Sequence, residues 1–287
     1  METFTYKTNS GFEITGDFYP ARSKNAPLLI YIHGGGLIWG SKKDLNNEQL
    51  HLYNEAGYNV FSINYRLAPE TKLPEIATDL ADCMRWVQED APAEMNYDRE
   101  RVAVIGSSAG GYLSLLSGTF PVKPKAIISF YGYGNILGGW YRMPSRYFNK
   151  DKKVPEPLAR QLIGNQPISE APIEKRYGIY LFCRQQGKWL DYVTGMSPIL
   201  EMNRLKQYCP IDLADTSYPP TLLLHGDADD DVPYSESVNM NEKLQELGVD
   251  SSLITIPDGA HQFDLEMDKP EVKETFIEVL DFLKMHL

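Results

Sequence analysis

A serine between glycines is the residue of this chain best suited to nucleophilic chemistry. Ser108 lies in residues 106–110, which read Gly-Ser-Ser-Ala-Gly and match the pattern G-x-S-x-G. In this pattern the serine occupies a sharp strand-to-helix turn that exposes its hydroxyl. Residues 101–105 resemble a short buried strand and residues 112–116 the start of an apolar helix. We therefore predict that Ser108 is a catalytic nucleophile; the alternative is a serine that only caps the helix.

A histidine followed by three glycines forms a second candidate element. Residues 33–36 read His-Gly-Gly-Gly and follow the apolar run 28–32. Attack of a serine on a carbonyl creates an oxyanion, which backbone N–H groups fixed in advance can stabilise. We expect this loop to supply such N–H groups; the alternative is an ordinary glycine-rich turn after a strand.

A nucleophilic serine also needs a base, and the base needs a carboxylate that orients it. His261 lies in a loop that follows a late predicted strand, and we predict it as the base. His225 ends a strand and precedes an acidic loop, so we expect it to be structural. His286 is the penultimate residue and is expected to face solvent.

The carboxylate has four candidates in one short loop. Asp227, Asp229, Asp230 and Asp231 all lie within residues 225–233. Most runs of charge are solvated surface loops, so the types of these residues alone leave the choice open.

Three motifs together resemble the hormone-sensitive-lipase-like carboxylesterases of the α/β-hydrolase superfamily. They are His-Gly-Gly-Gly, the segment Asn-Tyr-Arg-Leu-Ala-Pro-Glu at 64–70 and Gly-Ser-Ser-Ala-Gly-Gly at 106–111. Residues 225–233 resemble the H-G-x-x-D-x-x-V-P loop of esterases and prolyl-oligopeptidase-like hydrolases. The similarity covers about residues 31–131 and 219–263.

The resemblance implies roles for particular residues. It selects Asp229 as the acid, with Asp231 second, and it implies that Gly35, Gly36 and Ala109 donate hydrogen bonds to the oxyanion. Arg66 and Glu70 would hold loops near the site.

Two departures from the family pattern bear on the substrate. The family usually has aspartate where this chain has Ser107. It also usually has a long N-terminal cap, for which we expect no room before residue 33, so any cap should come from elsewhere.

Strands and helices alternate along most of the chain, which predicts a mostly parallel sheet covered on both faces. We predict an α/β-hydrolase fold with its core in residues 1–131 and 215–287 and a cap insertion at 132–214. Residues 12–19 alternate like an edge strand with one solvated face.

The predicted insertion is rich in aromatic residues, with ten of them between residues 132 and 195. The simpler interpretation is that they form a small core of the insertion. The sharper hypothesis is that some line an acyl or aryl pocket, for which we select Trp140, Tyr141 and Trp189.

Composition restricts the partners. The net charge of −11 argues against nucleic acid and anionic membranes. Three cysteines without metal-ligand spacing indicate a reducing compartment. The N-terminus lacks the features of a signal peptide and no apolar run is long enough to span a membrane, so we expect a cytoplasmic protein. A homodimer is compatible with the sequence.

These observations predict a serine esterase that hydrolyses short- to medium-chain acyl or aryl carboxylic esters through an acyl-enzyme, with no metal or organic cofactor. The alternatives are a small prolyl-oligopeptidase-like peptidase or amidase, an arylformamidase, and a non-catalytic small-molecule receptor on the same fold.

Overall fold

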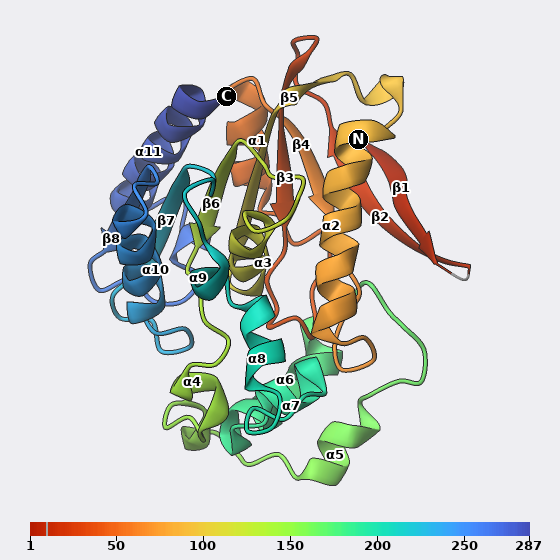
Figure 1. Cartoon of the computed structure of the whole chain (residues 1–287), viewed down its shortest axis with the longest axis vertical. Coiled ribbons are helices and arrows are strands. Elements are labelled where there is room, and N and C mark those ends of the chain that lie inside the picture. The colour runs from red at the N-terminus through yellow and green to blue at the C-terminus, as the bar shows by residue number, and fades with distance from the viewer. Residues whose placement is uncertain (10) are drawn as a thin grey trace.

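The computed structural model describes residues 1–9 and 11–287, which are built around one mixed sheet. Within these residues the sheet has eight strands in the order β1-β2-β4-β3-β5-β6-β7-β8 (Figure 1). β1, β2 and β4 pair antiparallel, whereas all neighbours from β4 to β8 are parallel. The strands are Glu2–Asn9 (β1), Phe12–Tyr19 (β2), Ala26–Ile32 (β3), Asn59–Ile63 (β4), Tyr97–Ser107 (β5), Ala126–Phe130 (β6), Thr221–Gly226 (β7) and Ser251–Ile256 (β8).

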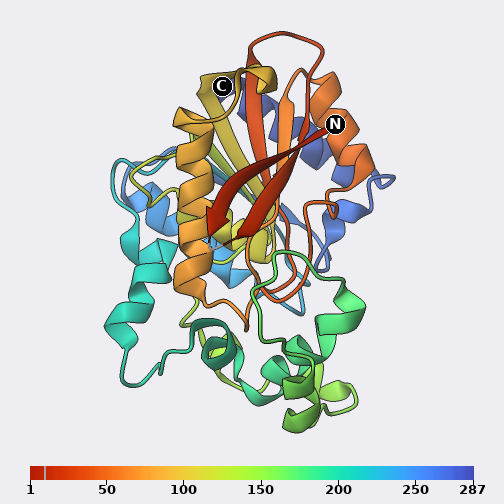
Figure 2. The same ribbon diagram turned by 90° about the vertical axis from the view of Figure 1, so that its right-hand side faces the viewer.

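Helices cover both faces of this sheet, as Figures 1 and 2 show from two sides. Successive side chains of a strand point to opposite faces. Leu28 and Ile30 therefore pack with buried residues of α2 and α3, whereas Leu29 and Tyr31 pack with those of α1 and α11. The helices that cover the sheet are Asn47–Glu55 (α1), Leu73–Glu89 (α2), Ala109–Ser117 (α3), Ser235–Glu246 (α10) and Pro270–His286 (α11).

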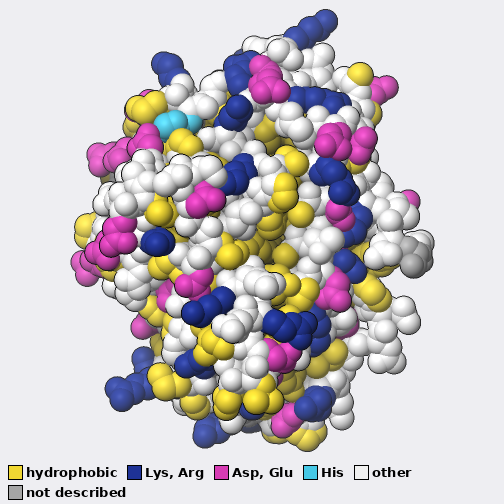
Figure 3. Space-filling view, viewed as in Figure 1, with side chains coloured by type: hydrophobic (Ala, Val, Ile, Leu, Met, Phe, Trp, Pro, Cys, Tyr) yellow, Lys and Arg dark blue, Asp and Glu magenta, His cyan; other side chains and the backbone are white. Residues whose placement is uncertain are grey.

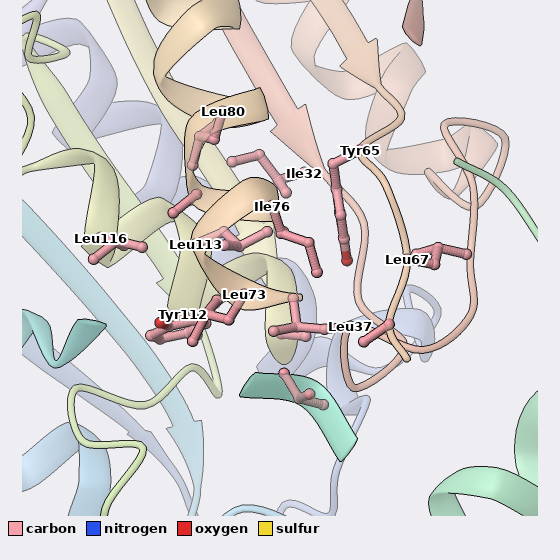
Figure 4. Packing of buried hydrophobic residues seen from close by; sticks show 14 of the residues in the cluster. Ile32, Leu37, Tyr65, Leu67, Leu73, Ile76, Leu80, Tyr112, Leu113 and Leu116 are labelled. Carbon is pink, nitrogen blue, oxygen red and sulfur yellow. The ribbon is translucent and has the colours of Figure 1, made fainter. Parts of the chain in front are cut away.

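The packing of α2 illustrates why the sequence folds in this way. Leu73, Ile76 and Leu80 recur at helical spacing and point toward Ile32 and Leu113 beneath them (Figure 4). All five side chains are buried. The mostly parallel sheet covered on both faces, which the alternation of strands and helices predicted, is confirmed.

One predicted detail of the sheet is wrong. β2 is not an edge strand, because β1 pairs along it and separates it from the sheet edge. β1 was not recognised because most of its side chains are polar and only Tyr6 is buried. A polar strand of this kind lacks the apolar alternation that identifies a half-buried strand.

A long segment separates β6 from β7 and lies at the end of the molecule that is lowest in Figure 1. Its buried Ile179 and Trp189 belong to the same hydrophobic cluster as Leu28 of the sheet, so the aromatic residues do not form a core of their own. The role of residues 132–214 as a cap stays a prediction. The helices of the segment are Gly139–Arg142 (α4), Glu156–Gln161 (α5), Ile173–Gln186 (α6), Trp189–Thr194 (α7), Met202–Leu205 (α8) and Pro210–Leu213 (α9).

Buried ion pairs tie this segment and α2 to the loop after β4. Arg66 in that loop pairs with Asp79 of α2 at 2.7 Å. Glu70 accepts hydrogen bonds from both terminal nitrogens of Arg176 on α6, each at 2.6 Å. The same guanidinium donates to the carbonyl oxygen of Ala68 at 2.7 Å. Both side chains of the Glu70–Arg176 pair are almost fully buried.

The surface in Figure 3 carries acidic and basic side chains that are interspersed, with hydrophobic side chains gathered near its centre. Among the described residues, no helix combines the length and the apolar character needed to cross a membrane.

The Glu70–Arg176 pair yields a prediction about stability. Glu70→Gln should lower the free energy of unfolding by about 3 kcal/mol, because a buried guanidinium loses its charged partner. Chemical denaturation monitored by circular dichroism measures this change. The control is Glu156→Gln, which breaks the exposed ion pair of Glu156 with Arg160. This substitution should leave the free energy of unfolding nearly unchanged. Equal effects of the two substitutions would contradict the assignment of Glu70 as an anchor.

Candidate active site

Ser108 lies in a strained turn between β5 and α3. Its φ of 55° and ψ of −119° fall outside the usual regions for a residue with a side chain, and its hydroxyl does not cap the helix. Small residues make the turn possible. A Cβ on Gly110 would lie 2.0 Å from the carbonyl oxygen of Ile32, and one on Gly106 would lie 2.5 Å from the Gly110 backbone. The Ser108 N–H donates to the Phe130 carbonyl at 2.9 Å, which fixes the turn to β6.

Three loops bring the predicted serine, histidine and aspartate together. Nε2 of His261 lies 3.2 Å from Oγ of Ser108, and Nδ1 lies 2.7 Å from Oδ2 of Asp229. The three residues follow β5, β8 and β7, which are parallel strands whose carboxyl ends meet at one edge of the sheet. The order of contacts is that of a nucleophile, a base and an orienting acid.

Asp229 is held by the backbone of its own loop as well as by two histidines. Its Oδ1 accepts hydrogen bonds from the N–H groups of Asp231 and Val232 at 2.8 and 2.9 Å. Its Oδ2 also lies 3.2 Å from Nε2 of the buried His225. Burial alone would raise the pKa of Asp229, but hydrogen bonds with His225 and His261 hold it far below its usual range. The carboxylate therefore stays ionised beside His261.

His225 supports this loop, as its position in the sequence suggested. Its Nδ1 lies 2.7 Å from Oγ of Ser237 on α10, and its Nε2 lies 3.1 Å from the carbonyl oxygen of Val232. The ring therefore joins the end of β7 to the acidic loop and to α10.

The charges around His261 favour its protonated form. Burial alone would lower the pKa of His261, but the hydrogen bond with Asp229 and the charges of Asp231, Asp229 and Asp264 outweigh it and raise the pKa above its ordinary value. The ring of Tyr131, with its centroid 4.6 Å away, packs against the imidazole.

The glycine loop after β3 lies against the serine turn. A Cβ on Gly34 would lie 3.0 Å from the Ser107 carbonyl oxygen and 3.4 Å from the Ser108 Cβ. Gly35 and Gly36 have φ values of 94° and 60°, which side-chain-bearing residues rarely adopt. Within residues 1–9 and 11–287, no hydrogen bond uses the N–H of Gly35, Gly36 or Ala109 as donor. These three N–H groups therefore have no hydrogen-bond acceptor within the described residues.

Tyr65 is a supporting residue of this loop that the sequence analysis did not identify. Its hydroxyl lies 3.0 Å from the carbonyl oxygen of His33 and 3.1 Å from that of Gly34, and its ring stacks on His33 at 4.3 Å. The sequence offered one indication of this role, the place of Tyr65 in the Asn-Tyr-Arg-Leu-Ala-Pro-Glu segment. That segment follows β4, which lies two strands away from β5 and Ser108 in the sheet.

A pocket of about 380 Å³ opens over Ser108 and His261. Its walls combine aromatic rings with carboxylates, and the acidic residues come from three separate loops. The lining residues include Tyr31, Gly34, Gly35, Gly36, Trp39, Asp44, Ser108, Tyr131, Tyr147, Phe148, Tyr177, Tyr180, Asp230, Asp231, His261 and Asp264.

The structure places Trp140, Tyr141 and Trp189 outside this pocket, which corrects their assignment to the substrate site. The ring of Tyr141 stacks on Trp140 at 3.6 Å and on Trp189 at 3.9 Å, and Nε1 of Trp189 donates to the Gly36 carbonyl at 3.0 Å. These rings pack behind the wall of the pocket, and Trp189 supports the glycine loop.

Four other aromatic residues of the same segment line the pocket instead, so the expectation that the segment supplies some aromatic residues to it holds. They are Tyr147, Phe148, Tyr177 and Tyr180. Composition identified the segment. Whether a ring faces the pocket or packs behind its wall depends on the tertiary packing of the segment, which no pattern in the sequence predicts.

In the described part of the chain, no group of three or more His, Cys, Asp or Glu side chains is arranged to hold a metal ion.

The geometry predicts how His261 titrates. We expect NMR of the ring nitrogens to give a pKa above the ordinary histidine value of about 6.5. Asp229→Asn should lower that pKa, because the main hydrogen bond and charge that favour the imidazolium are lost. Asp227→Asn is the matched control in the same loop and should shift it much less, since Asp227 is exposed and its charge is screened. An unshifted titration in Asp229→Asn would contradict this account.

The overall fold is similar to that of several solved structures. An α/β-hydrolase superfamily protein from Enterococcus faecalis is 24% identical, with a TM-score of 0.79 over 95% of this chain and 96% of that chain. An esterase from Pyrobaculum calidifontis is 22% identical, with a TM-score of 0.71 over 99% of this chain and 85% of that chain. At this level of identity the similarity establishes the fold.

Curated relatives are much longer proteins. The non-reducing polyketide synthase ausA of Emericella nidulans is 29% identical over 100% of this chain, but the chain spans only 14% of that protein. The family model described as BD-FAE matches residues 17–244, which is most of the chain. The chain therefore belongs to the BD-FAE family, whose domain is of the α/β-hydrolase type.

Proposed function

We propose that this chain is a serine esterase that hydrolyses short- to medium-chain acyl or aryl esters through an acyl-enzyme. The observation that carries the proposal is the continuous line of contacts from Ser108 through His261 to Asp229, at 3.2 and 2.7 Å. A solved structure of similar fold from Pyrobaculum calidifontis is an esterase by name, which is consistent with this chemistry.

In the proposed first step, Oγ of Ser108 attacks the ester carbonyl while Nε2 of His261 takes its proton. The ionised Asp229 keeps the remaining proton on Nδ1 and stabilises the imidazolium that forms. The imidazolium then gives its proton to the alcohol oxygen as the C–O bond breaks. Water attacks the acyl-enzyme with His261 again as base, which releases the acid and restores Ser108.

We propose that the oxyanion formed in each step is held by the N–H groups of Gly35, Gly36 and Ala109. The absence of other acceptors for these donors within the described residues supports this role. Fixed donors of this kind need no reorganisation when charge develops on the oxygen. The contacts of Tyr65 with the carbonyls of His33 and Gly34 would keep the loop in place.

The alternatives differ in the bond that is broken or in having no reaction at all. A peptidase, an amidase or an arylformamidase would use the same three residues on an amide. A receptor on this fold would not need a serine within hydrogen-bonding distance of a histidine, and the contact at 3.2 Å disfavours it.

We propose that the segment 132–214 acts as the cap of the site, since Tyr147, Phe148, Tyr177 and Tyr180 line the pocket.

The first test is hydrolysis of p-nitrophenyl acetate, butyrate, octanoate and palmitate. We expect rapid turnover of the shorter esters and little of the palmitate, because a pocket of about 380 Å³ with aromatic rings in its wall limits acyl length. Ser108→Ala should abolish turnover above the rate of the uncatalysed reaction. Unchanged hydrolysis by this variant would contradict the proposal, and turnover of matched amides or formamides alone would favour the alternatives.

The two candidate acids can be separated by rate. Asp229→Asn should lower kcat by roughly 10⁴-fold, because His261 then adopts the wrong tautomer. Asp231→Asn, measured on the plateau of its own pH profile, should keep kcat within about tenfold of the parent, because Asp231 does not contact Nδ1 of His261. A larger loss in Asp231→Asn than in Asp229→Asn would make Asp231 the orienting acid.

A further inference from the structure

A second carboxylate lies beside His261 and has no part in the proposed reaction. Oδ2 of Asp231 is 3.9 Å from Nε2 of His261, the nitrogen that faces Ser108 at 3.2 Å. Asp231 lines the pocket, and its side chain is only partly exposed. Nε2 therefore has two neighbours with opposite effects. It must accept the proton of the Ser108 hydroxyl, whereas the Asp231 carboxylate favours a proton that stays on Nε2.

The other oxygen of Asp231 is bound by two residues of α6. The hydroxyl of Tyr180 donates to Oδ1 at 2.6 Å, and Nη1 of Arg184 forms an ion pair with the same oxygen. Nη2 of Arg184 also donates to the backbone carbonyl of Asp231 at 2.9 Å. The segment between β6 and β7 thus reaches the loop that carries Asp229.

Arg184 is held in this position by aromatic side chains that surround its guanidinium. Its side chain is 2% exposed. The centroids of four aromatic rings lie 4.6 to 5.5 Å from its Cζ. Rings at these distances stabilise a desolvated cation. The four residues are Trp140, Tyr141, Phe148 and Tyr180, which gives a function to two of the aromatic residues that lie outside the pocket.

The proton position on His261 decides whether Ser108 can react. When Nδ1 carries the proton toward Asp229, Nε2 is free to accept the hydroxyl proton of Ser108. An unpaired carboxylate near Nε2 would favour the imidazolium, whose Nε2–H cannot accept a proton. Pairing with Arg184 and the hydrogen bond from Tyr180 reduce that competition, because they neutralise Asp231 on the side away from His261.

Within the described residues, Asp231 is the carboxylate that forms an ion pair with Arg184. Asp229 faces Nδ1 of His261 and is shared with His225. Asp264 on the loop after β8 is buried, and its carboxylate accepts hydrogen bonds from Tyr131 and Gln49. On the side of α6, the phenols of Tyr133, Tyr141 and Tyr177 are the titratable groups near Asp231, and burial raises the pKa of each. A change at Arg184 therefore acts mainly through Asp231.

We propose that Arg184 is a positioning residue that pairs with Asp231 so that Nε2 of His261 remains free for Ser108. The inference rests on the proposed function of the Ser108–His261–Asp229 site. Through this pair, the segment between β6 and β7 sets the lowest pH at which the site works.

The experiment compares pH profiles of kcat/KM for p-nitrophenyl butyrate. Arg184→Met keeps an unbranched side chain among the rings and should move the acidic limb upward by about one pH unit, since Asp231 is left unpaired. Arg184→Lys retains the charge, so the acidic limb of its profile should lie close to that of the parent. Asp231→Asn should move the limb downward, because a negative charge near the imidazolium is lost.

Two further variants make the test specific. The double variant Arg184→Met with Asp231→Asn should keep the acidic limb where Asp231→Asn alone places it, because the effect of Arg184 requires the carboxylate. Arg204→Met, which removes an exposed arginine of α8 paired with Glu201, is the matched control and should leave the profile unchanged. Thermal unfolding of each variant checks that the fold is retained.

NMR titration of the His261 ring in the same variants measures the effect without turnover. If no ester is hydrolysed by the parent, the proposed function fails, while these titrations still test the pairing. Shifts in opposite directions for Arg184→Met and Asp231→Asn are the expected result. A loss of activity at every pH in Arg184→Met with no shift of the limb or of the His261 titration would overturn the inference and leave Arg184 a purely structural residue.

Discussion

The site depends on the parallel pairing of β3 with β5. Ile32 at the end of β3 lies in register with Gly106 near the end of β5, so the segments that follow these two strands leave the sheet at the same level. The glycine loop and the serine turn must then pass within contact distance of each other. The Ile32 and His33 carbonyl oxygens would lie only 2.0 and 2.6 Å from a Cβ on Gly110. The absence of side chains at this crossing is therefore what allows Ser108 to lie against the glycine loop.

The same constraint explains which parts of the site could be predicted from the sequence. Ser108, His261 and the acidic loop each follow a strand that contains an apolar run, and the carboxyl ends of parallel strands lie at one edge of a sheet. Local patterns identified the strands, and topology then placed the loops together. The choice of Asp229 needed the resemblance to a family, because four aspartates in one loop have the same chemistry. The structure distinguishes them by contact, since Oδ2 of Asp229 lies 2.7 Å from His261.

What the sequence did not predict depends on contacts between distant or irregular elements. β1 is mostly polar, and it is a strand because β2 offers it an edge to pair with. α1 has polar residues in most positions and is stabilised at its start by the Asn46 side chain, which accepts a hydrogen bond from the Glu48 N–H. The aromatic residues of the segment after β6 were recognised as a group. Their division between the pocket wall and the layer behind it depends on how the whole segment packs. α4 and α7, which carry Trp140, Tyr141 and Trp189, are too short to give a periodic signal in the sequence.

That layer behind the wall connects the segment to the chemistry of the site. Trp189 donates to the Gly36 carbonyl, so the packing of α7 bears on the loop that carries the candidate oxyanion donors. Trp140 and Tyr141 surround Arg184, whose charge reaches Asp231 and, through it, the surroundings of His261. A carboxylate in a partly buried pocket exerts a longer-range effect on a titrating group than one in water. In a pocket lined by several acidic residues, compensation of the Asp231 charge favours a His261 that acts as a base, and the buried guanidinium of Arg184 is the group in position to provide it.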